Sequence, residues 1–177
     1  MPCKYWIRNT NSGFTILEIT IVIFIIVMGM MGVLSLVNQN IQVEYVNKNM
    51  IIASQLSQEG LELVRNKRDI NWLKEENWKY SSSTAFDIIQ DKNYAIDYTG
   101  AINAEPDDIS EVGTKLYKDS NGFYTNTSTD NTPTIFSRLI TVDTESDAST
   151  TISCWVQWKK GTNTYNFTAQ TVLYDWR

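Results

Sequence analysis

The sequence contains no histidine, and it has only two cysteines and three prolines among its 177 residues. Histidine is the commonest general base and the commonest zinc ligand, so its absence weakens any prediction of a zinc hydrolase or a Ser-His-acid catalytic site. No glycine-rich phosphate loop and no serine, cysteine or lysine nucleophile motif stands out either. The sequence therefore favours a protein that is not an enzyme and that uses no cofactor.

Positive charge is also scarce. The chain holds 15 basic and 20 acidic residues, which gives a net charge of −5 at neutral pH. A surface with this balance repels DNA and anionic lipid headgroups. We therefore expect no nucleic-acid partner.

One apolar block, residues 16–37, holds nearly all of the strongly hydrophobic sequence. Phe14 to Val37 is 24 residues, which as a helix would extend about 36 Å and span a hydrocarbon core of about 30 Å. Lys4 and Arg8 precede the block, so its amino end is expected to face the cytoplasm. No small-residue cleavage site follows the block, which indicates a retained single-pass anchor rather than an ordinary secretory signal.

Glu18 lies inside this apolar block. A carboxylate within a membrane helix costs about 2.5–3.5 kcal/mol on insertion scales, and such residues usually mark a function. Cleavage between Gly13 and Phe14 would create a free α-amino group that could neutralise Glu18. Because a helix cannot easily fold its own terminus back onto its fifth residue, we expect the amine to come from a neighbouring subunit.

The stretch Gly13-Phe14-Thr15-Ile16-Leu17-Glu18, after a short basic leader and before a long apolar run, resembles the class III signal of type IV prepilins and pseudopilins. The resemblance implies that a prepilin peptidase removes residues 1–13 by cutting after Gly13 and methylates the amino group of Phe14. It assigns Glu18 to filament assembly and no residue to catalysis. It also implies partnership with other pilin subunits and with an inner-membrane assembly platform.

Removal of residues 1–13 would leave 13 basic and 20 acidic residues, a net charge of −7. It would also remove Cys3, so that Cys154 becomes the single thiol. Cys154 lies in a run of alternating apolar and polar residues. We therefore expect a buried structural thiol rather than a reactive one.

Beyond residue 37 the helical pattern continues to Arg68 as an amphipathic segment. Its expected apolar stripe consists of Val46, Met50, Ala53, Leu56, Gly60, Leu63 and Val64. Gly60 costs about 1 kcal/mol relative to alanine in a helix. Either a close approach between helix and sheet compensates for it, or the helix tolerates it.

Residues 69–92 are expected to form an irregular connection, and short strands should follow. We predict strands over 94–98, 115–118, 122–125 and 135–142, and a terminal hairpin of 151–158 with 165–174. A long helix followed by a small antiparallel sheet is an α+β arrangement. It agrees with the pilin fold that the resemblance implies: a filament-core helix over 14–37, its amphipathic continuation over 38–68, and a globular head over 69–177.

Acidic residues give one weak metal-site prediction. Asp143, Glu145 and Asp147 alternate as carboxylates do in some calcium loops, but the glycine and the distant glutamate of an EF-hand are missing. A solvated turn is the preferred interpretation. Residues 105–108 form a similar and weaker cluster.

The leading hypothesis is a structural subunit of a type IV pilus or pilus-like filament, expected to be a minor pilin. Such a subunit enters the inner membrane first and then the pilus at the cell surface or a periplasmic filament. A type II secretion or competence pseudopilin has the same signal and remains an alternative. A membrane-anchored adhesin, whose 69–177 domain binds a surface or a sugar, is the alternative of another class.

Overall fold

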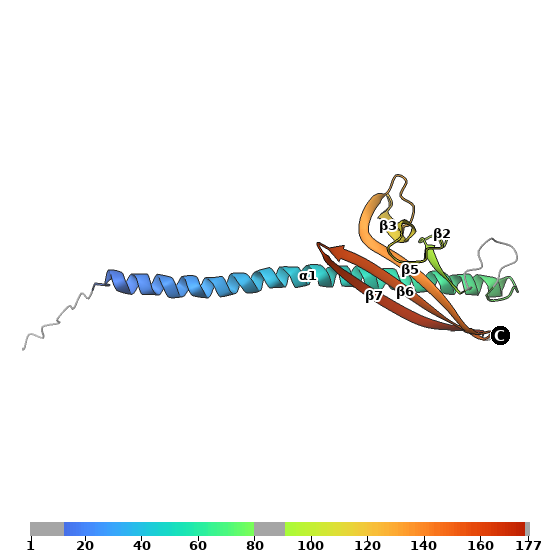
Figure 1. Ribbon diagram of the computed structural model, residues 1–177, viewed down its shortest axis with the longest axis horizontal. Helices are drawn as coiled ribbons and strands as arrows, with labels where there is room; N and C mark the ends of the chain where they lie inside the picture. Colours follow the sequence, from blue (N-terminus) through green and yellow to red (C-terminus); the bar gives the residue numbers. More distant parts are fainter. Residues whose placement is uncertain (1–12, 80–90, 176–177) are drawn as a thin grey trace, which may run out of the picture. The chain divides into compact units, whose positions relative to one another are not determined.

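The computed structural model describes residues 13–79 and 91–175, and the chain divides into two compact units, Met1–Tyr45 and Val46–Arg177. One helix, α1 (Ile16–Leu73), contributes to both units (Figure 1). It begins after Thr15, whose hydroxyl accepts a hydrogen bond from the Glu18 amide at 3.2 Å. Thr15 thus occupies the position of an N-cap, with a glutamate three residues later as in a capping box.

α1 ends five residues later than the sequence predicts. The helix extends through residues expected to be irregular, because Trp72 is buried in the core and the Arg68 guanidinium lies 4.4 Å from the centre of its ring. The last turn closes with a hydrogen bond from the Lys74 amide to the Ile70 carbonyl, and Glu75 then takes a φ of 60°. A residue in this left-handed region commonly terminates a helix.

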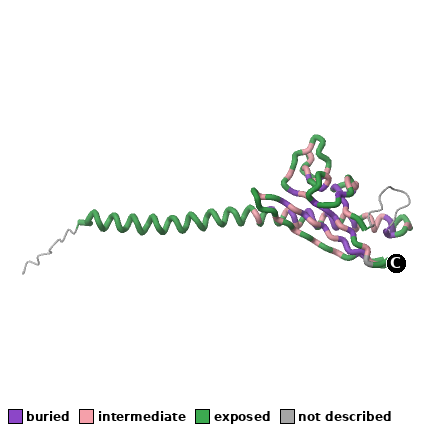
Figure 2. The backbone as a smooth tube through the Cα atoms, viewed as in Figure 1, coloured by how far each residue is buried: buried purple, intermediate pink, exposed green. Residues whose placement is uncertain are grey.

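In the first unit, every described residue is exposed (Figure 2). From residue 19 to residue 37 the helix has apolar side chains on all sides and no charged residue, and none of these residues is buried in the described chain. A helix of this kind belongs in a membrane or in the core of an assembly. Within the described part of the chain, α1 is the single helix long and apolar enough to cross a membrane, which is compatible with a membrane-anchored protein.

The second unit contains an antiparallel sheet of seven strands. They are β1 (Lys92–Ile96), β2 (Ile102–Ala104), β3 (Lys115–Lys118), β4 (Tyr124–Thr125), β5 (Thr132–Ser146), β6 (Ser149–Lys160) and β7 (Asn163–Tyr174). A single turn of 3₁₀ helix, Val112–Thr114, precedes β3. This α+β architecture of one long helix and an antiparallel sheet confirms the predicted fold class.

Strand β5 organises the sheet. On one side it pairs with β6, which pairs in turn with β7; on the other side it pairs with β1 through Val142 and Ile140, and with β3 through Ser137 and Thr132. Because β1 and β3 lie along the same edge of β5, the two small hairpins β1–β2 and β3–β4 are neighbours. This topology places their turns close to each other.

Several predicted boundaries were wrong. Tyr98 belongs to a turn rather than to the first strand, and β2 was not predicted. Asp143 and Glu145, expected in a solvated turn, lie in β5, which is longer than predicted because it pairs with β6 as far as Ser146. The chain turns only at Asp147 and Ala148.

The core lies between the second half of α1 and one face of the sheet. The alternating residues Ile152, Cys154, Val156 and Trp158 are all buried, and they pack with Ala53, Leu56 and Val64 of α1. Met50 was assigned to the buried stripe, but it is 40% exposed. The buried face is rotated by one position there, so that Asn49 is buried instead.

Candidate functional site

The predicted cleavage and assembly residues lie at the start of α1. Gly13 and Phe14 are exposed and precede the helix in irregular backbone, and Glu18 is exposed in its first turn. A carboxylate in this position also stabilises the helix locally, because its negative charge interacts favourably with the positive end of the helix dipole. In the described part of the chain, no basic side chain forms an ion pair with Glu18.

Acidic residues from the two clusters identified in the sequence lie around one cavity, which the sequence did not predict. Asp143 lines a cavity of about 390 Å³ together with Asp91, Glu105 and Asp107, so that the two clusters flagged separately share one surface. The Lys92 ammonium lies 2.9 Å from the Glu105 carboxylate, and the side-chain amide of Asn93 donates to the backbone carbonyl of Asp107 at 3.1 Å.

Asp91 accepts a hydrogen bond from the Thr144 amide, and hydrogen bonding with Thr144 lowers the pKa of this carboxyl group. Among the residues that the structure describes, no three side chains are arranged to hold a metal ion. Asp147 is exposed in its turn, and the side chain of Glu145 lies outside the described set. The calcium site therefore stays a prediction.

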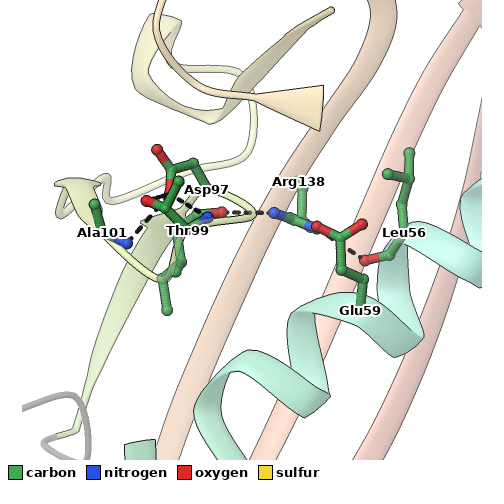
Figure 3. Close-up of polar contacts among 7 residues, drawn as sticks. Leu56, Glu59, Asp97, Thr99, Ala101 and Arg138 are labelled. Atoms are coloured by element: carbon green, nitrogen blue, oxygen red, sulfur yellow. Dashed lines mark hydrogen bonds and ion pairs between the residues drawn. The ribbon is translucent and has the colours of Figure 1, made fainter. Parts of the chain in front are cut away.

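Arg138 is the main charged group inside the second unit, and sequence reasoning missed it. Its side chain is 1% exposed. The guanidinium donates to the Leu56 carbonyl of α1 at 3.1 Å and to the Ile96 carbonyl of β1 at 2.6 Å, and it lies 3.2 Å from Glu59 (Figure 3). It thereby links the helix, β1 and β5, and its role is structural. A single arginine within a predicted strand does not indicate that its side chain is buried.

The β1–β2 and β3–β4 hairpins have turns with the same hydrogen-bond pattern, in which an aspartate accepts from the amides two and four residues later. In the β1–β2 turn, the Asp97 carboxylate accepts hydrogen bonds from the Thr99 amide at 2.9 Å and the Ala101 amide at 3.2 Å (Figure 3). In the β3–β4 turn, Asp119 accepts from the Asn121 amide at 2.9 Å and the Phe123 amide at 2.8 Å.

Each of these turns has glycine three residues after the aspartate, with a φ of 81° at Gly100 and 91° at Gly122. Only glycine adopts these angles without strain. The strands predicted over 115–118 and 122–125 already placed the second turn between them, and its Asp-x-x-Gly pattern, repeated at residues 97–100, is the signal that could have located the first.

The two turns meet through an aromatic pair. The rings of Tyr98 and Phe123 are stacked, with centroids 5.0 Å apart and planes inclined by 21°. The Tyr98 hydroxyl donates to the Asp119 carboxylate at 3.3 Å. Partial desolvation and the neighbouring Asp119 charge raise the pKa of Tyr98, so its hydroxyl remains a donor at neutral pH.

Desolvation alone would raise the pKa of Asp119. The hydrogen bonds that it accepts from the Phe123 and Asn121 amides and from the Tyr98 hydroxyl lower the pKa instead. Asp119 is therefore ionised at neutral pH and acts as an acceptor.

Cys154 is fully buried, as predicted. Burial raises the pKa of its thiol to about 11, against the opposing effects of the Arg138 charge and a hydrogen bond with Ser57. The thiol is protonated at neutral pH and cannot act as a nucleophile.

Searches against protein-family models, curated proteins and solved structures found no match to this chain.

Proposed function

We propose that this chain is a subunit of a type IV pilus or a related filament, made as a membrane-inserted precursor that is cleaved after Gly13. The observation that carries the proposal is the order of features at the amino end. The bond between Gly13 and Phe14 lies in exposed irregular backbone, α1 begins at Ile16, and the only carboxylate of the apolar block, Glu18, follows in its first turn.

Two further features support this proposal. The apolar side chains of the first unit have no covering within the chain, so burying them requires lipid or other subunits. The second unit has a core of its own, built from α1 residues after Val46 and the sheet. A chain with an anchoring half and a self-contained head suits a subunit that moves from a bilayer into a filament.

In this proposal, Glu18 determines the register in which subunits assemble. Cleavage exposes the α-amino group of Phe14, which would approach Glu18 of an adjacent subunit and form an ion pair in an apolar environment. An unpaired charge there is costly, whereas a paired one is tolerated. Subunits would therefore enter the filament in the register that brings each amine next to a carboxylate.

We assign the chain to the minor pilins of such a filament, with prepilin peptidase and an inner-membrane assembly platform as partners. The pseudopilins of type II secretion or competence systems share the same signal and are the second candidate. In either case the precursor resides in the inner membrane with its amino end in the cytoplasm.

Mass spectrometry of the protein from its native membrane tests the processing step. The expected mature chain begins with N-methylated Phe14 and lacks residues 1–13. An intact chain that still begins at Met1 in cells with an active prepilin peptidase would contradict the proposal.

Glu18→Ala tests the assembly step. We expect this variant to insert and to be cleaved normally, but to enter filaments poorly, because the neighbouring amine loses its partner. Glu44→Ala is the matched control, since Glu44 is an exposed acid farther along the same helix. Quantitative immunoblotting of sheared filaments against membranes measures incorporation, and equal incorporation of both variants would remove Glu18 from assembly.

A further inference from the structure

We propose that the Tyr98–Phe123 pair and the two turns that carry it form a carbohydrate-binding site for the C–H face of a neutral pyranose sugar. The site is formed within the second unit, so the inference does not depend on filament assembly. It rests on the exposure of the two rings, the rigidity of the turns and the polar groups around them.

The exposure distinguishes this pair from the other aromatic contacts. Tyr98 is 39% exposed and Phe123 is 54% exposed. The other ring pairs in the described part of the chain, Tyr124–Phe136, Phe136–Trp158 and Trp158–Tyr165, each include Phe136 or Trp158, which are 4% and 1% exposed. Those pairs belong to the core, whereas Tyr98 and Phe123 pack on each other and still face solvent.

The rings are held in place before any ligand binds. Asp97 fixes the first turn through the Thr99 and Ala101 amides, and Asp119 fixes the second through the Asn121 and Phe123 amides. The hydrogen bond from Tyr98 to Asp119 then joins the turns. A surface ordered in this way loses little conformational entropy on binding.

The surrounding groups select the class of ligand. Aromatic faces carry partial negative charge and attract the polarised C–H groups of a sugar ring. Thr99, Ser120 and Asn121 are exposed on the same two turns, and the ionised Asp119 carboxylate retains lone pairs that can accept from sugar hydroxyls. An apolar platform with a few oriented polar groups is typical of small-ligand sites.

Other ligands fit less well. Nucleic acid is disfavoured by the Asp97 and Asp119 charges and by the overall charge of −5. Two half-exposed rings present only about 200 Å² of aromatic surface, far below the ~800 Å² per partner of a stable protein interface. A neutral sugar, which needs one aromatic platform and two or three hydrogen bonds, matches both the size and the charge of the site.

The test uses the full chain in detergent micelles and neoglycoproteins that carry terminal β-galactose, β-glucose or β-N-acetylglucosamine. In these sugars the axial hydrogens at C1, C3 and C5 form one apolar face. We expect concentration-dependent binding of at least one of them by biolayer interferometry. Phe123→Leu, which keeps an apolar side chain but removes the ring, should weaken binding about tenfold.

Tyr174→Leu is the matched control, because Tyr174 is an aromatic residue of β7 with a similar exposure of 58%. It should bind the sugar as the unmodified chain does. Asn121→Ala provides a second test if Phe123→Leu disturbs folding, because it shortens an exposed side chain and leaves the Asn121 amide that Asp119 requires. Thermal unfolding shows which variants retain the fold.

Absence of binding by the folded chain to all three neoglycoproteins at sugar concentrations up to about 10 mM would overturn the proposal. So would equal binding by folded Phe123→Leu and Tyr174→Leu chains, since the sugar would then be bound elsewhere. Loss of self-association of the micellar chain in Phe123→Leu, without any sugar binding, would identify a protein contact instead and would also overturn it.

Discussion

Gly60 lies where α1 passes over β5 and β6. A methyl group added there would lie 2.6 Å from the sulfur of Cys154 and 3.3 Å from Cδ1 of Ile140. Of the two interpretations that the sequence left open, the close approach between helix and sheet is therefore confirmed. The cost of glycine in a helix is offset by the packing that the missing side chain permits.

Gly60→Ala should lower the free energy of unfolding by about 1–2 kcal/mol, because overpacking costs more than the gain in helix propensity. Cys154→Ala removes the sulfur that the new methyl group meets. The double variant should therefore lose less stability than the sum of the two single variants. Urea titration of the full chain in micelles, followed by tryptophan fluorescence, measures this coupling, and strictly additive losses would contradict it.

Asp119 gives the second turn a dependence on pH. Its pKa is lowered in the folded chain because it accepts hydrogen bonds from the turn, despite partial desolvation. The stabilisation from the charged form is therefore present above the unfolded value of about 3.8, and it is lost as pH falls through the lower folded value. Near pH 7 the contribution is complete and constant.

Asp119→Asn keeps an oxygen that can accept from the turn amides but removes the charge. We expect the unmodified chain to be more stable than this variant at pH 7, and the difference in melting temperature to shrink as pH falls below about 4. Differential scanning calorimetry from pH 7 to pH 2.5 measures the difference. A gap that stays constant over this range would show that the carboxylate charge does not matter.

At the scale of elements, Ser57 joins the helix to two strands. Its hydroxyl donates to the Cys154 carbonyl of β6 at 2.7 Å and accepts from the Ala169 amide of β7 at 3.2 Å. The residue is fully buried. A buried hydroxyl with two backbone partners in other elements fixes the position of the helix along the sheet.

Ser57→Ala should destabilise the second unit by about 1–3 kcal/mol, because it removes two hydrogen bonds between α1 and the sheet, one of them buried. Ser54→Ala is the matched control, since Ser54 donates only to the Ile51 carbonyl of its own helix and should change stability by less than about 0.5 kcal/mol. Amide hydrogen exchange at Ala169 reports the local effect. Unchanged protection of this amide in Ser57→Ala would contradict the assigned role.

The elements most accessible from the sequence were those with strong periodicity. The alternation of Ile152, Cys154, Val156 and Trp158 predicted the buried face of β6, and all four are buried. The apolar block predicted the first half of α1. The end of α1 was more difficult to predict. The basic residues Lys67 and Arg68 are typical of a helix end, but the helix continues to Leu73 because Trp72 packs into the core.

Residues that act through tertiary contacts could not be predicted. Arg138 reads as a solvent-exposed residue of a strand, and its burial depends on carbonyl groups 82 and 42 residues away. The meeting of Tyr98 with Phe123 likewise depends on β1 and β3 sharing one edge of β5. The residues that neighbour them in the sequence indicate neither the burial of Arg138 nor the contact between Tyr98 and Phe123.

At the scale of the whole molecule, the chain consists of two units, an exposed apolar helix in the first and a compact core in the second. The buried residues of α1 begin at Asn49, so in the described part of the chain its earlier residues add nothing to a core. From Val46 onward the chain forms one compact unit. Folding of the second unit should therefore not require the first.

A fragment of residues 46–177 should be soluble without detergent and should unfold cooperatively, because it retains the buried residues of α1, the Arg138 linkage and the whole described sheet. The full chain, with the apolar helix attached, should require micelles. Near-UV circular dichroism and thermal unfolding compare the two. The fragment could lack the near-UV circular dichroism signal that the chain in micelles shows. The first unit would then contribute to the core, and the division into an anchor and an independent head would be wrong.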